Sequence, residues 1–405
     1  MRLFILYLTF GLIVLNFQII HSQNKSIHNI EIPFILDHNR MIVEGEIQRL
    51  DGSWRSVRFW VDSGNPDFFI SDILAKDLGI DLSGKKTSTD GSAQPIELIS
   101  PPKIKLEGTE FILSHSKSSV LFQPRFLFNT MHIDANIPST FLKQFHIVFD
   151  YPNNKLIIAQ NGVLKSRGTP VPVLINTSTG IVQISTIIGK DSVSLALDNG
   201  ASYSFISDDL FSKLKDQNPK WPFHKGALGC ANMWGYWPPE EESWPILRIS
   251  NFTSGNFDFK SVGVVGISGI GEWYSRKTQQ PVRGFLGANL LKNYRVGIDY
   301  SNNTIYFENS SHPDYDDMTI VGLTLRLEDN GYYRIIGIAD VDNKPFITGI
   351  QTGDLLIKVD GFDTYNKTMG NVIGRLRGKV GDTKKLIIER EGRQFEINAP
   401  VIKYL

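Results

Sequence analysis

Two short acidic motifs occur in the same local setting, one in each half of a repeat. They are the triplets Asp62-Ser63-Gly64 and Asp198-Asn199-Gly200. A stretch of alternating apolar residues, which is typical of a half-buried strand, runs into each triplet. The same four residue types, Phe-Ile-Ser-Asp, follow at the same distance, as Phe69–Asp72 and Phe205–Asp208. We therefore expect two equivalent strand–turn units that each present one carboxylate.

Two carboxylates held face to face can hydrolyse a peptide bond. Like charges about 3 Å apart cannot both ionise easily, so the Asp62–Asp198 pair would share one proton. The ionised carboxylate would take a proton from a bound water, which attacks the peptide carbonyl, and its protonated partner would donate to the carbonyl oxygen. The glycine in each triplet allows the tight turn that aims the carboxylate. This chemistry needs no metal and no other cofactor, and the residues leave open which aspartate holds the proton.

A second pair of matched blocks closes each half of the repeat. Leu142–Ile158 and Leu291–Phe307 both predict a strand, an Asn-Asn turn and a second strand. These blocks are 149 positions apart, against 136 for the triplets, so the second half has gained 13 residues between its two blocks. The pattern predicts a mainly β protein with a duplicated lobe, the first over 28–160 and the second over 168–308.

A third unit is expected after the two lobes. The segment Asn309–Asp317 is rich in Ser, Asp, Asn and Pro, which predicts a linker. Residues 319–400 then contain a short loop-like run followed by strand and helix patterns. The run is Gly322-Leu323-Thr324-Leu325, the strands are predicted at Tyr332–Ile338, Asp354–Val359 and Lys385–Glu389, and the helix is predicted near Lys367–Leu376.

The N-terminus has the parts of a secretory signal peptide. Arg2 precedes Leu3–Ile20, which carries no charge, and the polar run His21–Asn24 follows. We therefore expect residues 1–23 to be a signal peptide and the protein to be exported, to the periplasm or outside the cell. The apolar run is long enough that an uncleaved membrane anchor stays open as an alternative.

The composition argues against several other classes of function. Lys plus Arg and Asp plus Glu both number 42, so the formal net charge is zero. This balance gives no sign of the excess basic charge that binds nucleic acids. It also gives no charge-based attraction to a membrane surface, so membrane attachment would need an uncleaved N-terminal segment. The eight histidines include no His-Glu-x-x-His zinc motif. With Cys230 as its single cysteine, the chain forms no intrachain disulfide.

These features resemble the retropepsin and pepsin class of aspartic proteases, and more narrowly bacterial exported aspartyl-protease-like proteins with a C-terminal PDZ domain. The resemblance covers most of residues 28–400 and implies that Asp62 and Asp198 are the catalytic aspartates of an aspartic-type endopeptidase. It implies an acid-protease-like fold followed by a PDZ-like domain, with a peptide or protein as substrate. Gly322–Leu325 resembles the PDZ loop whose backbone N–H groups bind a peptide's C-terminal carboxylate, so protein C-termini are expected partners.

The sequence departs from that family at two places. Asn199 replaces the Thr or Ser whose hydroxyl, in the family, joins hydrogen bonds beneath the carboxylates; Ser63 keeps this hydroxyl in the first triplet. The segment Ala135–Pro138, just before Phe141-Leu142, lacks glycines that Phe285-Leu286-Gly287 retains in the second half. The alternative is a catalytically inactive protein on the same fold that binds peptides or acts as a scaffold.

Overall fold

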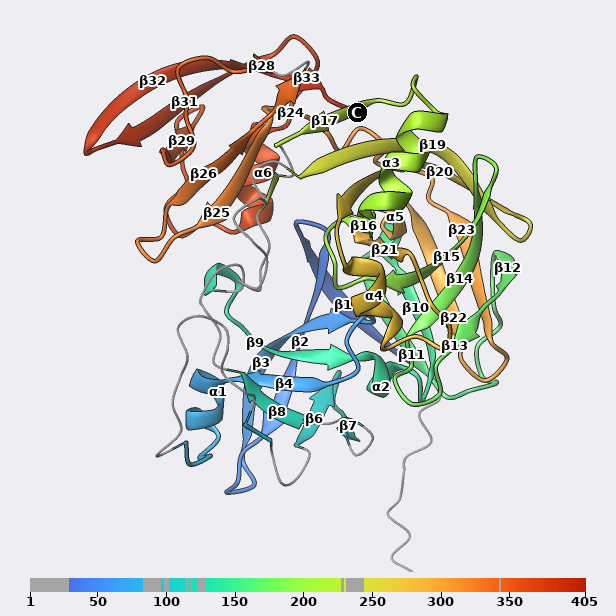
Figure 1. Cartoon of the computed structure of the whole chain (residues 1–405). Coiled ribbons are helices and arrows are strands. Elements are labelled where there is room, and N and C mark those ends of the chain that lie inside the picture. Colours follow the sequence, from blue (N-terminus) through green and yellow to red (C-terminus); the bar gives the residue numbers. More distant parts are fainter. Residues whose placement is uncertain are drawn as a thin grey trace, which may run out of the picture.

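The computed structural model describes residues 29–82, 96–97, 102–113, 116, 118–121, 129–226, 229–230, 244–341 and 344–405. Strands dominate, and they form two lobes with a third unit beside them (Figure 1). This confirms the expected mainly β, duplicated two-lobe fold. The expected signal peptide at residues 1–23 lies outside the described residues.

The first lobe contains strands β1 to β11 and two short helices. Its strands are β1 (Ile30–Asp37), β2 (Arg40–Gln48), β3 (Trp54–Asp62), β4 (Phe68–Ser71), β5 (Ile96–Glu97), β6 (Lys103–Leu106), β7 (Thr109–Ile112), β8 (Ser118–Leu121), β9 (Ile133–Pro138), β10 (His146–Asp150) and β11 (Lys155–Ala159). Its helices are α1 (Asp72–Asp77) and α2 (Ser139–Leu142), with 3₁₀ turns at Asn129–Met131 and Tyr151–Asn153.

The second lobe repeats this order. Its strands are β12 (Thr169–Pro172), β13 (Leu174–Ile175), β14 (Val182–Ile188), β15 (Asp191–Asp198), β16 (Ser204–Ser207), β17 (Phe223–Lys225), β18 (Gly229–Cys230), β19 (Pro245–Ser254), β20 (Phe257–Ile267), β21 (Gly284–Gly287), β22 (Tyr294–Asp299) and β23 (Thr304–Asn309). Its helices are α3 (Asp208–Gln217), α4 (Ile270–Ser275) and α5 (Ala288–Leu291).

The two expected Asn-Asn hairpins are present and meet in the middle of the molecule. Strands β10 and β11 form one hairpin, β22 and β23 form the other, and the second Asn of each turn has the left-handed backbone that Asn tolerates. Strand β10 pairs antiparallel with β22, which places Val148 opposite Gly297. The separation of these two residues along the chain equals the offset of the repeated blocks. A pseudo-two-fold axis therefore passes between them and relates the lobes.

The additional residues of the second lobe fall in two places. Ser71 pairs with Leu121, whereas its counterpart Ser207 pairs with Ile267. The chain between Ser207 and Ile267 is ten positions longer than the chain between Ser71 and Leu121. Ten of the additional residues therefore lie between β16 and the end of β20. The other three lie between β20 and β21, in the segment that contains helix α4.

The third unit is built on a sheet with the order β25-β26-β29-β31-β32, against which helix α6 packs (Figure 1). Its elements are β24 (Thr319–Ile320), β25 (Leu323–Leu327), β26 (Tyr333–Ile338), β27 (Asp340–Val341), β28 (Lys344–Pro345), β29 (Leu355–Val359), β30 (Phe362–Asp363), α6 (Met369–Leu376), β31 (Thr383–Arg390), β32 (Arg393–Pro400) and β33 (Ile402–Lys403). The three predicted strands and the helix lie where the sequence places them. The PDZ-like nature of this unit stays a prediction.

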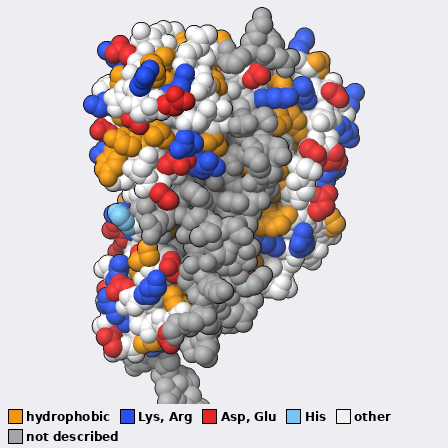
Figure 2. All heavy atoms as spheres, turned by 60° about the vertical axis from the view of Figure 1, so that its left-hand side comes forward, with side chains coloured by type: hydrophobic (Ala, Val, Ile, Leu, Met, Phe, Trp, Pro, Cys, Tyr) orange, Lys and Arg blue, Asp and Glu red, His pale blue; other side chains and the backbone are white. Residues whose placement is uncertain are grey.

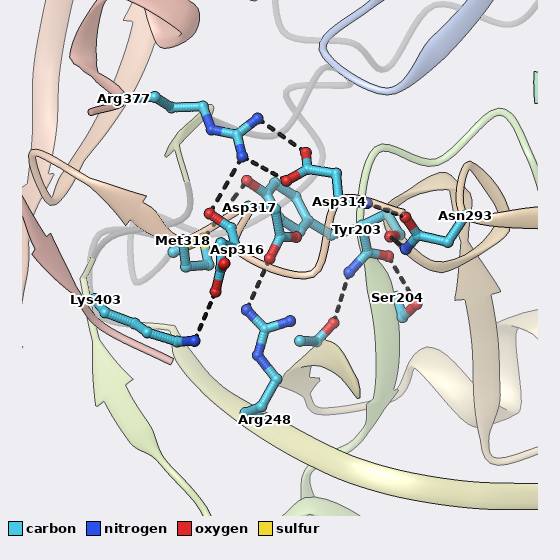
Figure 3. A network of polar contacts seen from close by, with 12 residues as sticks. Tyr203, Ser204, Arg248, Asn293, Asp314, Asp316, Asp317, Met318, Arg377 and Lys403 are labelled. Atoms are coloured by element: carbon cyan, nitrogen blue, oxygen red, sulfur yellow. Dashed lines mark hydrogen bonds and ion pairs between the residues drawn. The ribbon is translucent and has the colours of Figure 1, made fainter. Parts of the chain in front are cut away.

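Ion pairs of Asp314, Asp316 and Asp317 hold the predicted linker against its surroundings (Figure 3), and that of Asp316 is with Lys403 at 2.6 Å. The carboxylate of Asp314 accepts from both ends of the Arg377 guanidinium, at 2.9 and 2.6 Å, and from Lys292 Nζ at 2.9 Å. Arg248 of β19 pairs with Asp317 at 2.7 Å, and the two side chains are only 6% and 7% exposed. Burial alone would raise the pKa of Asp314, but Arg377 and Lys292 hold it far below its usual range. The linker therefore fixes the third unit on the second lobe.

Candidate active site

Asp62 and Asp198 end equivalent strands in the two lobes. Asp62 is the last residue of β3, beside Pro138 of the parallel strand β9. Asp198 is the last residue of β15, beside Gly287 of the parallel strand β21. Each carboxylate thus projects from a loop at the end of a parallel strand pair. The pseudo-two-fold axis turns these two loops toward each other.

Reciprocal hydrogen bonds join the two loops beneath the carboxylates. The backbone N–H of Ser63 donates to Asn199 Oδ1 at 2.8 Å, and the backbone N–H of Asn199 donates to Ser63 Oγ at 3.0 Å. Both side chains are buried. The amide oxygen of Asn199 therefore accepts the bond that a hydroxyl oxygen would accept in its place.

Each glycine of the triplets leaves room for the aspartate of the other lobe. A Cβ atom added to Gly64 would lie 2.2 Å from Asp198 Cγ, and one added to Gly200 would lie 2.5 Å from Asp62 Oδ1. Real Cβ atoms essentially never approach another heavy atom closer than 3.0 Å. Glycine is thus favoured at both positions by the approach of the carboxylates, since neither Gly64 nor Gly200 has the left-handed backbone that would itself favour glycine.

The two carboxyl groups are buried and interact directly. Asp62 is 4% exposed and Asp198 is 8% exposed. Burial raises the pKa of Asp62 well above its ordinary value, and the charge of Asp198 and a hydrogen bond between the carboxyl groups raise it further. Burial also raises the pKa of Asp198, against the effect of its hydrogen-bond donors. Because two close, buried carboxyl groups cannot both ionise easily, the pair is expected to bind one proton between its members.

Two residues of the second lobe that the sequence did not point to also reach the pair. Tyr274, on helix α4, donates from its hydroxyl to Asp198 Oδ2 at 2.9 Å. The half-buried Lys277 follows the helix, and its charge lowers the pKa of both Asp62 and Asp198. Both lie in the segment between β20 and β21, for which the repeat offers no matched residues. The repeat therefore carried no signal for them.

The segment Ala135–Pro138 contains no glycine, unlike its counterpart Phe285-Leu286-Gly287 in the second lobe. Its Asn136 side chain accepts from the N–H of Phe69 at 2.8 Å and donates to the carbonyl of Asp67 at 3.0 Å. Asn136 is fully buried, so these bonds tie β9 to the loop after Asp62. Pro138, which has no N–H to donate, is the last residue of β9 and lies beside Asp62.

The Gly322–Leu325 run of the third unit is buried and already bonded. The N–H of Gly322 donates to the Tyr404 hydroxyl at 3.0 Å, and the N–H of Leu323 donates to the Val321 carbonyl at 2.9 Å. Strand β18 of the second lobe pairs with β25 along Thr324 and Leu325. A peptide carboxylate that binds these N–H groups would have to displace Tyr404.

Neither a metal centre nor a membrane span appears in the part of the chain that the structure describes. No group of three or more His, Cys, Asp or Glu side chains is placed to hold a metal ion there. Within the same residues, no helix combines the length and the apolar character needed to cross a membrane. On the face drawn in Figure 2, the described Lys, Arg, Asp and Glu side chains are interspersed, in keeping with the zero net charge.

Comparison with known proteins gives one type of match. No family model and no curated protein matches the chain. Among solved structures, the chain is similar to the aspartic proteinase from Irpex lacteus, with 11% sequence identity and a TM-score of 0.41. The match covers 70% of this chain and 98% of that one. The repeated lobes and their strand pairing, rather than this similarity, carry the assignment of the fold.

Proposed function

We propose that this protein is an aspartic-type peptidase in which Asp62 and Asp198 activate one water molecule. The observation that carries the proposal is the symmetric pair of loops: two buried carboxyl groups each lie against the glycine of the other triplet, over reciprocal Ser63–Asn199 hydrogen bonds. Perturbed pKa values caused by burial and by a like charge are typical of catalytic groups.

The chemistry follows from the shared proton. The ionised carboxylate takes a proton from water as the water oxygen attacks the peptide carbonyl, and the protonated carboxyl donates its proton to the carbonyl oxygen. The resulting diol collapses when the first carboxyl passes its newly gained proton to the amine nitrogen and the second regains a proton from the diol. The C–N bond breaks, one water is consumed, and the pair returns to its starting state.

The test is cleavage of denatured casein by the purified protein between pH 3 and pH 8. Asp62→Asn and Asp198→Asn each remove one carboxylate while they keep the side-chain shape, so each should lower cleavage by several orders of magnitude. Asp72→Asn and Asp208→Asn are the matched controls, because each lies ten residues after a dyad aspartate, at the start of a helix. The controls should cleave like the wild type. Unchanged cleavage by Asp62→Asn would refute the proposal.

The alternative of a non-catalytic peptide-binding protein is a distinct outcome of the same test. It predicts peptide binding without turnover by the wild-type protein at every pH. This alternative was suggested by Asn199 and by the segment Ala135–Pro138. In the structure, however, the side chains of Asn199 and Asn136 both make hydrogen bonds that support the loops of the candidate site. We therefore favour the enzyme.

Two further parts of the proposal concern the ends of the chain. Residues 1–23 would direct export and be removed, which N-terminal sequencing of the protein from its native host checks. The third unit would recruit peptide ends through Gly322–Leu325. Since Tyr404 occupies the N–H of Gly322, Tyr404→Phe should strengthen binding of a peptide with a free C-terminus, measured by calorimetry, and leave binding of its amidated form unchanged.

A further inference from the structure

The hydroxyl of Tyr274 lies at the junction of the two lobes. It is 2.9 Å from Asp198 Oδ2 in its own lobe and 3.2 Å from the Gly64 carbonyl oxygen in the other. One hydroxyl proton can serve only one of these acceptors at a time, and an ionised carboxylate is the stronger acceptor. The tyrosine is 1% exposed, and its ring packs against Phe285 at a centroid distance of 4.9 Å, so the hydroxyl is held in place.

The hydrogen-bond donors of the dyad are distributed unequally. Among the described residues, Asp198 accepts from the N–H groups of Gly200 and Ala201 at 2.9 and 3.1 Å and from Tyr274. Asp62 accepts from the N–H of Gly64 at 3.1 Å. Donors to a carboxylate stabilise its ionised form. In the described part of the chain, two donors to Asp198 thus have no counterpart at Asp62: the N–H of Ala201 and the hydroxyl of Tyr274, a side chain that the first lobe does not match.

Resting on the proposed function, we propose that Tyr274 is a positioning residue that keeps the negative charge of the dyad on Asp198 and the shared proton on Asp62. Asp198 is then the base that takes the proton from water, and Asp62 is the acid that donates to the peptide carbonyl. This assignment gives the two aspartates different roles.

The other charged groups around Asp198 do not produce this asymmetry. These groups are Asp62 in the other lobe, Lys277 just after helix α4, and the buried Tyr151 just after strand β10. The charge of Lys277 lowers the pKa of both carboxyl groups, so it does not favour ionisation of Asp198 alone. Burial raises the pKa of Tyr151 to a value at which this phenol stays neutral while the dyad titrates. Among the side chains, Tyr274 alone donates to one aspartate and not to the other in the described part of the chain.

The decisive experiment is direct titration of the dyad in the full mature protein, by ¹³C NMR of labelled Asp carboxyl groups. In Tyr274→Phe the ring stays and the hydroxyl is lost, so the lower dyad pKa should rise by about one to two units. Tyr294→Phe is the matched control, because this tyrosine is also buried and its hydroxyl oxygen accepts a hydrogen bond from the backbone N–H of Lys260 at 3.2 Å. It should leave the dyad unchanged. The acid limb of kcat/KM should move upward with the dyad pKa in Tyr274→Phe only.

A second comparison does not depend on Tyr274→Phe being folded. The single aspartate that remains in Asp62→Asn is Asp198, with three donors, and its pKa should be lower than that of Asp62 in Asp198→Asn. The reverse order, or an unchanged dyad titration in folded Tyr274→Phe, overturns the inference. Either result leaves the proposed peptidase intact, because that rests on loss of cleavage in the aspartate variants. Conversely, the NMR titration reports on Tyr274 even if no cleavage is found.

Discussion

The approach of each aspartate to the glycine of the other lobe gives a sharp prediction for Gly64→Ala. The added methyl carbon would lie 2.1 Å from Tyr274 Oη and 2.2 Å from Asp198 Cγ. These neighbours, or the Gly64 backbone, would have to move by about 1.3–1.9 Å before ordinary contact of 3.4–4 Å is restored. Displacement of a catalytic group by about 1 Å can cost roughly 100-fold in rate, and overpacking a buried site costs about 1–3 kcal/mol in the free energy of unfolding.

We therefore expect Gly64→Ala to lower kcat/KM for casein-derived peptides at least about 100-fold and to lower the free energy of unfolding by about 1–3 kcal/mol. The control is Gly374→Ala in helix α6, where an added Cβ meets nothing within 4 Å and alanine should stabilise by about 0.5–1 kcal/mol. Urea unfolding and steady-state kinetics check both variants. Wild-type kinetics and stability in Gly64→Ala would refute the steric reasoning for the site.

Three further predictions concern stability. Asp62→Asn should raise the melting temperature at pH 7 but not at pH 3. The folded pKa of Asp62 lies above its ordinary value of 3.8, so the free-energy cost of folding with this carboxyl group begins near pH 4 and grows as the pH rises toward the folded pKa. Equal gains in melting temperature at both pH values would contradict this. Arg248→Met should lower the free energy of unfolding, measured in urea, by about 3–5 kcal/mol, since it leaves Asp317 buried and unpaired. The double variant with Asp317→Leu should recover most of this loss. No recovery would show that the loss comes from packing instead. Asp37→Ala should lower the free energy of unfolding by about 1 kcal/mol and speed hydrogen exchange in α6. The reason is that Asp37 of the first lobe accepts from Thr368 Oγ1 at 2.5 Å and from the N–H of Gly370 at 3.1 Å. Unchanged exchange would show that this contact does not hold the helix.

The parts of the fold that could be predicted from the sequence are those that the chain contains twice. The strands that end at Asp62 and Asp198 and the two Asn-Asn hairpins all lie in matched blocks. Repetition doubles the signal of a short strand, which alone is ambiguous. The third unit has no internal copy, yet its strands were found because turn residues separate apolar runs clearly.

The parts of the site that could not be predicted depend on contacts between distant segments. Tyr274 reaches Asp198 across 76 residues, and it comes from a segment without a counterpart in the first lobe. Asn199 is one of the two departures from the family pattern on which the catalytically inactive alternative rests. The sequence could not show that its amide oxygen lies where the N–H of Ser63 needs an acceptor. Type and spacing thus identify the carboxylates, whereas their donors depend on the packed structure.

The pairing of Val148 with Gly297 on the pseudo-two-fold axis has a consequence for the origin of the chain. A single first lobe would present the edge of β10 without a neighbour, and a second identical copy could bind that edge in the same register, Val148 against Val148. Two identical short chains would then form a homodimer with one aspartate from each. Fusion of such copies into one polypeptide lets each half accept its own substitutions. A residue such as Tyr274 can enter only after that step, because a homodimer would carry it on both sides of the dyad.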